Sequence, residues 1–352
     1  MTAGPVFIVG SMGSGSTLLR LMLDSHGNLA IPEETGFMRL VSANRWVPRW
    51  RQGGRWYRRL GLSRADLDAE LAAFYGSLFT RYAAARGKRR WGDKTPLHTW
   101  HMKDMAALFP DAQFVGIVRH PGGTTVSLTT RFRRRFDRAV THWLRLNNQL
   151  VREGARLGER FVLLRYEDLV AQPREVMTEL LAWLGEPWSD DVLRHHEVQV
   201  RAGSRRTSDG LTRPGDPIDP ERASRWASAL SDEERTELTT RTAAWAAFFG
   251  YDVAAPQHLE QLDGTRRTLL DGVELRARRR RLRGTVDLAP PPRPKREGPY
   301  RPRPRGARPL TQDTVPDWAA EPARVLLDRL PQRAQRALRR ARDRAVGDRP
   351  AR

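Results

Sequence analysis

The chain has 352 residues and a net charge of +21, with 62 Lys or Arg against 41 Asp or Glu. This length allows one large or two modest domains with a sizeable core. Because the chain contains no cysteine, a disulfide framework, a thiolate nucleophile and a Cys-based zinc site are excluded. The apolar run at residues 6–9 is too short for a signal peptide, and no later run has the roughly 18 apolar residues of a membrane span. We therefore expect a cytoplasmic protein.

Short apolar strands alternate with longer helical patterns over the first 250 residues, which predicts an α/β fold with a parallel sheet flanked by helices. Pro173 and Gly185 fit the two ends of one helix, and Ser231 to Glu234 form a capping box that opens another. The expected strands are 6–9, 114–118 and 161–165, and the expected helices are 17–24, 98–108, 173–184 and 231–250, with further helices inserted between 46 and 90.

The pattern changes near residue 254, which divides the chain into an expected domain at 1–254 and a basic extension at 255–352. Residues 271–352 hold 23 Arg or Lys and 10 Asp or Glu, and so account for +13 of the net charge. Helices are expected at 259–283 and, with a basic amphipathic pattern, at 321–346. The Pro- and Arg-rich stretch between them predicts extended chain. The last helix fits a solvated helix docked on the domain, or a contact with an anionic membrane surface or nucleic acid.

The N-terminal strand runs through a Gly/Ser loop into a helix, which is typical of a phosphate-binding turn. Gly10, Gly13 and Gly15 permit a tight turn whose N–H groups converge, and the helix N-terminus adds partial positive charge. Gly10 and Gly15 have the spacing of a nucleoside-triphosphatase loop, but Ser16 stands where that loop has lysine. The sequence therefore favours a nucleotide whose reactive end is not that of ATP–magnesium.

A second anion site is predicted where the strand 114–118 ends. Arg119 follows this strand, and a Pro-Gly-Gly turn then leads into a helix that contains Ser127. Open parallel sheets bind ligands at the carboxyl ends of their strands, and an arginine fork with a nearby hydroxyl suits a phosphate. Two separate anion sites fit a nucleotide with a 5′ anhydride and a 3′-phosphate.

With these motifs the chain resembles the sulfotransferases that use 3′-phosphoadenosine 5′-phosphosulfate (PAPS), and more distantly the tyrosylprotein sulfotransferases. The resemblance implies the P-loop-like sulfotransferase fold and in-line transfer of a sulfuryl group from PAPS, the co-substrate, to an acceptor hydroxyl or amine without a metal. The matching blocks are Gly10–Thr17, Leu21–His26, Pro32–Thr35, Trp91–Pro96, Val118–Ser127 and Leu164–Leu169.

The resemblance also implies roles for individual residues. Lys94 would steady the bridging oxygen as the nucleotide leaves, because an ammonium suits a developing negative charge. The 5′-phosphosulfate would lie on Ser14, Gly15, Ser16 and Thr17, and the 3′-phosphate on Arg119 and Ser127. With a looser match, Ser204, Arg206 and Arg213 would belong to a loop that closes over the nucleotide.

A base must remove the proton of the acceptor. Glu34 matches the catalytic glutamate of the tyrosylprotein branch, and its neighbour Glu33 is an alternative. A second branch uses a histidine, so that His98 and His101 remain candidates, whereas His120 is interpreted as a structural residue of its turn.

The chain departs from the tyrosylprotein pattern at two glycines. Gly13 replaces a basic residue of the first loop, and Gly36 replaces the arginine after the Glu-Thr pair. The expected acceptor is therefore a small molecule, a glycan or a glycolipid rather than a peptide tyrosine. Aromatic residues at 46, 50, 56 and 57 fit either a packed helical lid or acceptor stacking, and their neighbouring arginines would suit an anionic substrate or a membrane-bound acceptor.

Two other functions remain open from the residues alone. A kinase-like phosphotransferase would need magnesium and a lysine from elsewhere, such as Lys94. A non-enzymatic anion- or nucleic-acid-binding protein would account for the net charge. We expect no specific nucleic-acid partner, because the basic residues concentrate in the extension and no nucleic-acid motif is present.

Overall fold

The computed structural model describes residues 4–46, 51–202, 215–253 and 269–281, and these lie in a single compact unit, Met1–Pro292. Its strands are β1 (Val6–Gly10), β2 (Leu29–Ala30), β3 (Arg90–Lys94), β4 (Gln113–Val118), β5 (Phe161–Arg165) and β6 (Leu269–Asp271). Its α-helices are α1 (Ser16–Ser25), α2 (Met38–Trp46), α3 (Arg51–Arg59), α4 (Arg64–Ala84), α5 (Met102–Leu108), α6 (Pro121–Phe132), α7 (Phe136–Leu157), α8 (Tyr166–Ala171), α9 (Pro173–Leu184), α10 (His195–Arg201), α11 (Asp232–Phe249) and α12 (Gly272–Arg281). The 3₁₀ helices are η2 (Pro96–His101), η3 (Gly158–Arg160), η4 (Asp190–Val192), η5 (Pro220–Ala223) and η6 (Arg225–Ser228).

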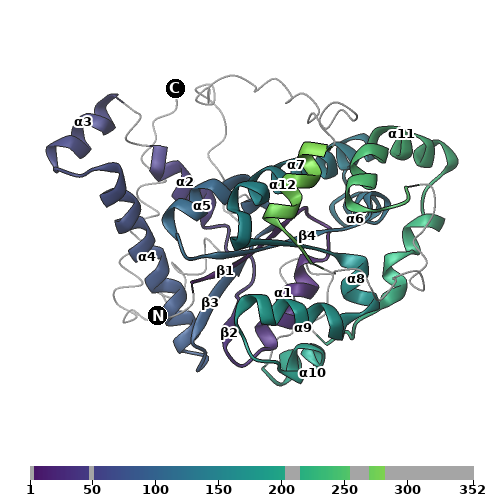
Figure 1. The fold of residues 1–352 in the computed structure, drawn as a ribbon, viewed down its shortest axis with the longest axis horizontal. Coiled ribbons are helices and arrows are strands. Elements are labelled where there is room, and N and C mark those ends of the chain that lie inside the picture. Colours follow the sequence, from purple (N-terminus) through teal and green to yellow (C-terminus); the bar gives the residue numbers. More distant parts are fainter. Residues whose placement is uncertain (1–3, 47–50, 203–214, 254–268, 282–352) are drawn as a thin grey trace, which may run out of the picture. The chain divides into compact units, whose positions relative to one another are not determined.

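The strands form one sheet in the order β2-β3-β1-β4-β5-β6 (Figure 1). All neighbouring pairs are parallel except β5 and β6, which are antiparallel. In the two central pairs Ile8 is opposite Lys94 on β3, and Gly10 is opposite Ile117 on β4. The carboxyl ends of β1, β3 and β4 therefore meet at one edge of the sheet.

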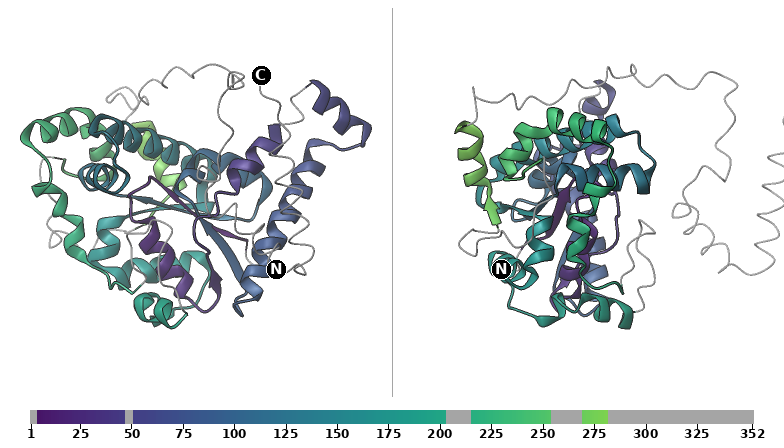
Figure 2. Two further views of the ribbon diagram at one scale, coloured as in Figure 1. Left: turned by 180° about the vertical axis from the view of Figure 1, so that it is seen from behind. Right: turned by 90° about the vertical axis from the view of Figure 1, so that its right-hand side faces the viewer.

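Helices cover both faces of the sheet (Figures 1 and 2), and β1 shows why. Val6 and Ile8 pack with apolar side chains of α1, α8 and α9. Phe7 and Val9 point to the opposite face, where they pack with α5, α7, α11 and α12. A strand buried on both faces is a continuous apolar run, as β1 is, because side chains alternate between two hydrophobic layers.

The fold expected from the sequence is confirmed, and the strands at residues 6–10, 113–118 and 161–165 agree with it within a residue. The helix α9 has the predicted bounds and ends at Gly185, which adopts a φ of 74°. The helix α11 begins with the predicted capping box, in which Ser231 accepts from the Glu234 N–H. The local signals of caps and apolar runs thus gave correct element ends.

Two expected elements differ from the structure. The helix predicted at 98–108 is a 3₁₀ helix, η2, followed by α5, because Pro96 begins a tighter turn right after β3. Of the helix expected at 259–283, residues 259–268 and 282–283 lie outside the described residues, 269–271 form β6 and 272–281 form α12. The predicted helix at 321–346 also lies outside them.

The folded unit continues beyond residue 254, where the extension was expected to begin. The strand β6 pairs with β5, Leu275 of α12 is fully buried, and Arg276 donates through Nε and a terminal nitrogen to the Ala155 carbonyl at 2.9 and 2.6 Å. Part of the segment assigned to the basic extension therefore completes the sheet and its covering layer.

A buried polar cluster fastens the turn after β4 to the segment that follows α11. The Glu167 carboxylate accepts from the Tyr251 hydroxyl at 2.7 Å and from the His120 N–H at 3.0 Å. His120 stacks on Trp226 at 4.2 Å and accepts through Nδ1 from the Gly122 N–H, so it is a structural residue of the turn, as expected. Burial raises the pKa of the Glu167 carboxyl, which makes each donor to it costly to lose.

We predict that Tyr251→Phe lowers the free energy of unfolding by about 1–3 kcal/mol, because the buried Glu167 carboxylate loses its hydroxyl donor while the ring packing is kept. Urea unfolding at neutral pH measures the loss. Tyr82→Phe is the matched control, since the half-buried Tyr82 packs through its ring on Arg86. Equal stability of the Tyr251 and Tyr82 variants would contradict the prediction.

Candidate active site

The loop between β1 and α1 is anchored by Thr99 at its start, and the backbone N–H groups at its end have no side-chain cap. Gly10 donates its N–H to the Thr99 hydroxyl and accepts from it, each at 2.9 Å. Gly13 and Gly15 adopt φ of 80° and 92°, a region that favours glycine. The first turn of α1 contains no acidic residue and Gly15, its N-cap, provides no side-chain cap. The N-terminal N–H groups of this ten-residue helix are thus available for an anion.

Arg119 lies beside this loop, at the end of β4. Its guanidinium donates to the Arg222 carbonyl at 2.5 Å and to the Gly13 carbonyl at 3.4 Å. It also lies over the Tyr166 ring, with Cζ 4.4 Å from the centroid. Its Nε is buried and has no hydrogen-bond partner within the part of the chain that the structure describes. Arg119 therefore keeps one buried donor that the described residues leave without an acceptor.

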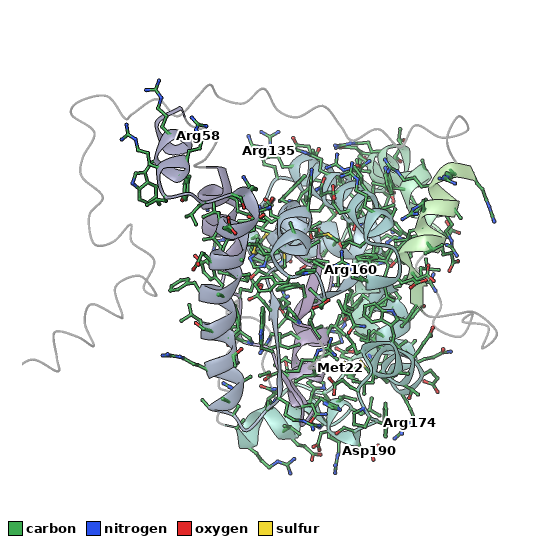
Figure 3. The ribbon with its side chains drawn as sticks, turned by 60° about the vertical axis from the view of Figure 1, so that its left-hand side comes forward. Met22, Arg58, Arg135, Arg160, Arg174 and Asp190 are labelled. Atoms are coloured by element: carbon green, nitrogen blue, oxygen red, sulfur yellow. The ribbon has the colours of Figure 1, made fainter. Side chains whose placement is uncertain are left out.

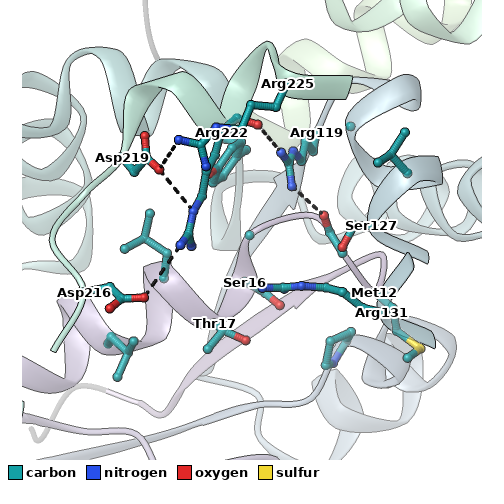
Figure 4. Close-up of a pocket in the computed structure, with 18 of the residues that line it drawn as sticks. Met12, Ser16, Thr17, Arg119, Ser127, Arg131, Asp216, Asp219, Arg222 and Arg225 are labelled. Carbon is teal, nitrogen blue, oxygen red and sulfur yellow. Dashed lines mark hydrogen bonds and ion pairs between the residues drawn. The ribbon is translucent and has the colours of Figure 1, made fainter. Parts of the chain in front are cut away.

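These groups line one cavity of about 480 Å³ (Figure 4). The cavity runs from the loop to the 3₁₀ helices η5 and η6. The predicted site residues that line it are Gly15, Ser16, Thr17, Glu34, Arg119 and Ser127. Ser14 belongs to the same loop but does not line the cavity. It is fully buried, and its hydroxyl has no partner among the described residues. Ser204, Arg206 and Arg213 lie outside the described residues.

Lys94 and Glu34 form an ion pair at the wall of the cavity. Lys94 ends β3 with a side chain that is 1% exposed, and its Nζ lies 2.6 Å from Oε1 of Glu34, which is 36% exposed. The same ammonium donates to the Thr17 hydroxyl at 3.4 Å. The pair places a carboxylate at the cavity surface and a cation directly behind it.

Of the candidate bases, Glu34 alone lines the cavity; Glu33, His98 and His101 do not. His98 is buried, with Nδ1 2.9 Å from Asp93 and Nε2 accepting from the Met38 N–H. His101 shares a hydrogen bond of 2.8 Å with the Ser42 hydroxyl, and burial lowers its pKa. Both histidines therefore make their contacts away from the cavity lining, with Asp93, Met38 and Ser42.

The wall opposite the loop was not predicted from the sequence. Arg222 and Arg225 both contact the Asp219 carboxylate, at 3.3 and 3.0 Å, and Trp226 lines the cavity beside them. These residues belong to short 3₁₀ turns, which have no periodic pattern to reveal them. Arg131, on α6, was also missed. Figure 4 shows its side chain extending toward Ser16, so that it brings positive charge to a loop without lysine.

The sequence model of the sulfotransferase family matches residues 5–190. The chain belongs to the sulfotransferase family. It is 28% identical over 263 residues to protein-tyrosine sulfotransferase 1 of Danio rerio, which covers 70% of this chain and 72% of that protein. It is also 28% identical to protein-tyrosine sulfotransferase 2 of Gallus gallus, over 70% of this chain and 69% of the relative. The expected enzyme class is therefore confirmed.

A solved structure shares the fold of this sulfotransferase. The sulfotransferase domain from the curacin biosynthetic pathway superposes with a TM-score of 0.52 and 20% identity, over 71% of this chain and 98% of that domain. In the described ranges, no group of three or more His, Asp or Glu is arranged to hold a metal ion, and no helix there is both long and apolar enough to cross a membrane.

We predict that Gly15→Ala lowers the free energy of unfolding of this sulfotransferase by about 1–3 kcal/mol, because a Cβ at that φ is strained. The added atom would also lie 2.2 Å from Cδ2 of Tyr166. Urea unfolding measures the change. In the control Gly27→Ala the new Cβ meets no atom within 4 Å, and its effect should stay within about 0.5 kcal/mol. Similar losses in both variants would contradict the prediction.

Proposed function

We propose that this sulfotransferase transfers a sulfuryl group from PAPS to an acceptor hydroxyl or amine, with Glu34 as the base. The observation that carries the proposal is one cavity lined by the first turn of α1 and by Arg119, with the Lys94–Glu34 pair at 2.6 Å in its wall. PAPS supplies an activated sulfuryl group on a phosphosulfate anhydride and, at the ribose, a 3′-phosphate. The uncapped α1 N-terminus and the unpartnered Nε of Arg119 fit these two groups.

In this proposal the 5′ end is held by Gly15, Ser16 and Thr17, with Ser14 behind them, and the 3′-phosphate by Arg119 and Ser127. The ring of Tyr166 lies beside Gly15 and beneath the Arg119 guanidinium. It therefore separates the loop proposed for the 5′ end from the arginine proposed for the 3′-phosphate. Burial raises the pKa of the Tyr166 phenol, which keeps this ring neutral beside anions.

The Lys94–Glu34 pair provides the two polar groups that the transfer needs. Glu34 is a carboxylate at the cavity surface and can accept the proton of an acceptor hydroxyl. Lys94 can donate to the oxygen on which negative charge develops as the nucleotide leaves. Thr17 contacts Lys94 and so links this cation to the phosphate-binding loop.

For the acceptor we propose a small molecule, a glycan or a glycolipid. The relatives are named as protein-tyrosine sulfotransferases. This chain has glycine at positions 13 and 36, where the tyrosylprotein pattern has basic residues, and the backbone at both positions suits glycine. A Cβ at Gly13 would lie 3.1 Å from Ser127 Oγ, and Gly36 adopts a φ of 63°, which disfavours a basic side chain at either position. Peptide-tyrosine recognition would thus have to use other residues.

The nucleotide site is tested by calorimetric titration of the full chain with 3′-phosphoadenosine 5′-phosphate in EDTA, beside ATP with magnesium. We expect binding of the former without metal, and at least about tenfold weaker binding by Arg119→Ala, because a charge-assisted hydrogen bond to phosphate is lost. Arg138→Ala, an exposed arginine of α7, is the charge-matched control. Binding of ATP with magnesium alone would overturn the proposal in favour of a phosphotransferase, and binding of neither would favour a non-enzymatic role.

The base is tested by Glu34→Gln, which keeps the shape of the side chain and removes its basicity. We expect turnover of PAPS to fall about 10²–10⁴-fold with whichever phenol, sugar or glycolipid of a panel supports transfer, while binding of 3′-phosphoadenosine 5′-phosphate changes little. The adjacent Glu33→Gln is the matched control and should keep most activity. An active Glu34→Gln enzyme would exclude Glu34 as the base.

A further inference from the structure

The helix α3 stands clear of the sheet and of the helices that cover it, joined to them through α2 and α4 (Figures 1 and 2). Among residues 53–59, whose side chains the structure describes, Arg55, Trp56, Arg58 and Arg59 are exposed, and the exposed Leu60 follows directly. Figure 3 shows Arg58 on the part of this helix that lies farthest from the body. The surface of α3 and Leu60, which we call the α3 surface, is thus open to a partner.

The α3 surface is basic without acidic neighbours in the sequence. Residues 35–65 contain eight arginines and no Asp or Glu. Arg45 and Arg64 of this stretch pair with Asp68 on α4. Arg55, Arg58 and Arg59 instead form no ion pair with any other residue in the described ranges. Their charge is therefore not neutralised within that part of the protein.

An apolar pair lies among these arginines. Trp56 is 56% exposed and Leu60 is 51% exposed, and residues four apart lie on the same face of a helix. This arrangement matches a membrane interface. There, aromatic and aliphatic side chains enter the boundary of the acyl chains, while guanidinium groups remain among the lipid phosphates.

We propose that the α3 surface binds an anionic lipid bilayer, with Trp56 and Leu60 inserted and Arg55, Arg58 and Arg59 at lipid phosphates. Nucleic acid or an acidic protein would satisfy the arginines, but a bilayer also takes the exposed aromatic–aliphatic pair. This inference does not depend on the proposed sulfuryl transfer. Docking holds the enzyme at the bilayer, the place where a glycolipid acceptor is found.

The apolar part is tested by co-sedimentation of the full chain with neutral phosphatidylcholine vesicles and with vesicles that contain about one third phosphatidylglycerol. We expect binding to the anionic vesicles alone. Trp56→Ala with Leu60→Ala should weaken it at least about tenfold. Phe74→Ala with Leu78→Ala is the matched control, because Phe74 and Leu78 are 59% and 47% exposed at the same spacing on α4, and residues 65–80 contain no arginine.

The charged part is tested by replacing Arg55, Arg58 and Arg59 with Gln, which should weaken vesicle binding on the order of 100-fold. The control replaces three exposed arginines in the last turn of α4 and in the segment that follows it, namely Arg81, Arg86 and Arg89, with the same change in net charge. Both α3 variants should keep thermal stability and binding of 3′-phosphoadenosine 5′-phosphate.

Four results would overturn the proposal. The first three are a wild-type chain found only in the unbound fraction, wild-type binding by both α3 variants, and control variants that lose as much binding as the α3 variants. The fourth is loss of binding by the arginine variant together with wild-type binding by the Trp56 and Leu60 variant, since the contact would then be electrostatic only. A parallel titration with duplex DNA should show no effect of Trp56→Ala with Leu60→Ala.

Discussion

The site depends on the position of β1 between β3 and β4. Because β1, β3 and β4 are parallel, their carboxyl ends lie at the same edge of the sheet. The loop after β1, Lys94 and Arg119 therefore come together there, although more than a hundred residues separate the loop from Arg119. The approach is close: a Cβ at Gly10 would lie 2.5 Å from the Ile117 carbonyl oxygen. Glycine at the end of β1 is therefore required by the register itself, before any ligand is considered.

The strands that carry the site differ in how well the sequence reveals them. The apolar runs of β1, β4 and β5 are recognisable because both of their faces are hydrophobic. The strand β3, Arg-Trp-Gly-Asp-Lys, is hidden by its charges, although four of its five residues are buried. Arg90 pairs with Glu186, Asp93 with Thr35 and His98, and Lys94 with Glu34. All of these partners except His98 are distant in the chain; they make the charges tolerable in the interior, and no local pattern contains that information.

The same limit applies to the site as a whole. Motif spacing indicated the loop and Arg119, because these are set by glycine geometry and by strand ends, whereas Glu34 was indicated only by the resemblance to the tyrosylprotein sulfotransferases. The opposite wall, with Asp219, Arg222 and Trp226, is set by tertiary contacts such as the stacking of Trp226 on His120 and the hydrogen bond from Arg119 to the Arg222 carbonyl. The sheet completed by β6 was missed for a similar reason, since a three-residue strand gains its stability from β5 and not from its own sequence.

Electrostatics explains how the Glu34 side chain is held in place in the turn at Pro32–Thr35, most of which is exposed. Burying an unpaired ammonium costs several kcal/mol of folding free energy. The buried Lys94 therefore favours the position of the Glu34 carboxylate in which the two groups are paired. The next residue, Thr35, donates to Asp93 at 2.6 Å, and Asp93 in turn lies 2.9 Å from His98. The turn is thereby fixed at two points by consecutive residues. Because Lys94 also contacts Thr17, the same ammonium connects the candidate base to the first turn of α1, so a single buried cation relates the Glu34 turn to the loop after β1.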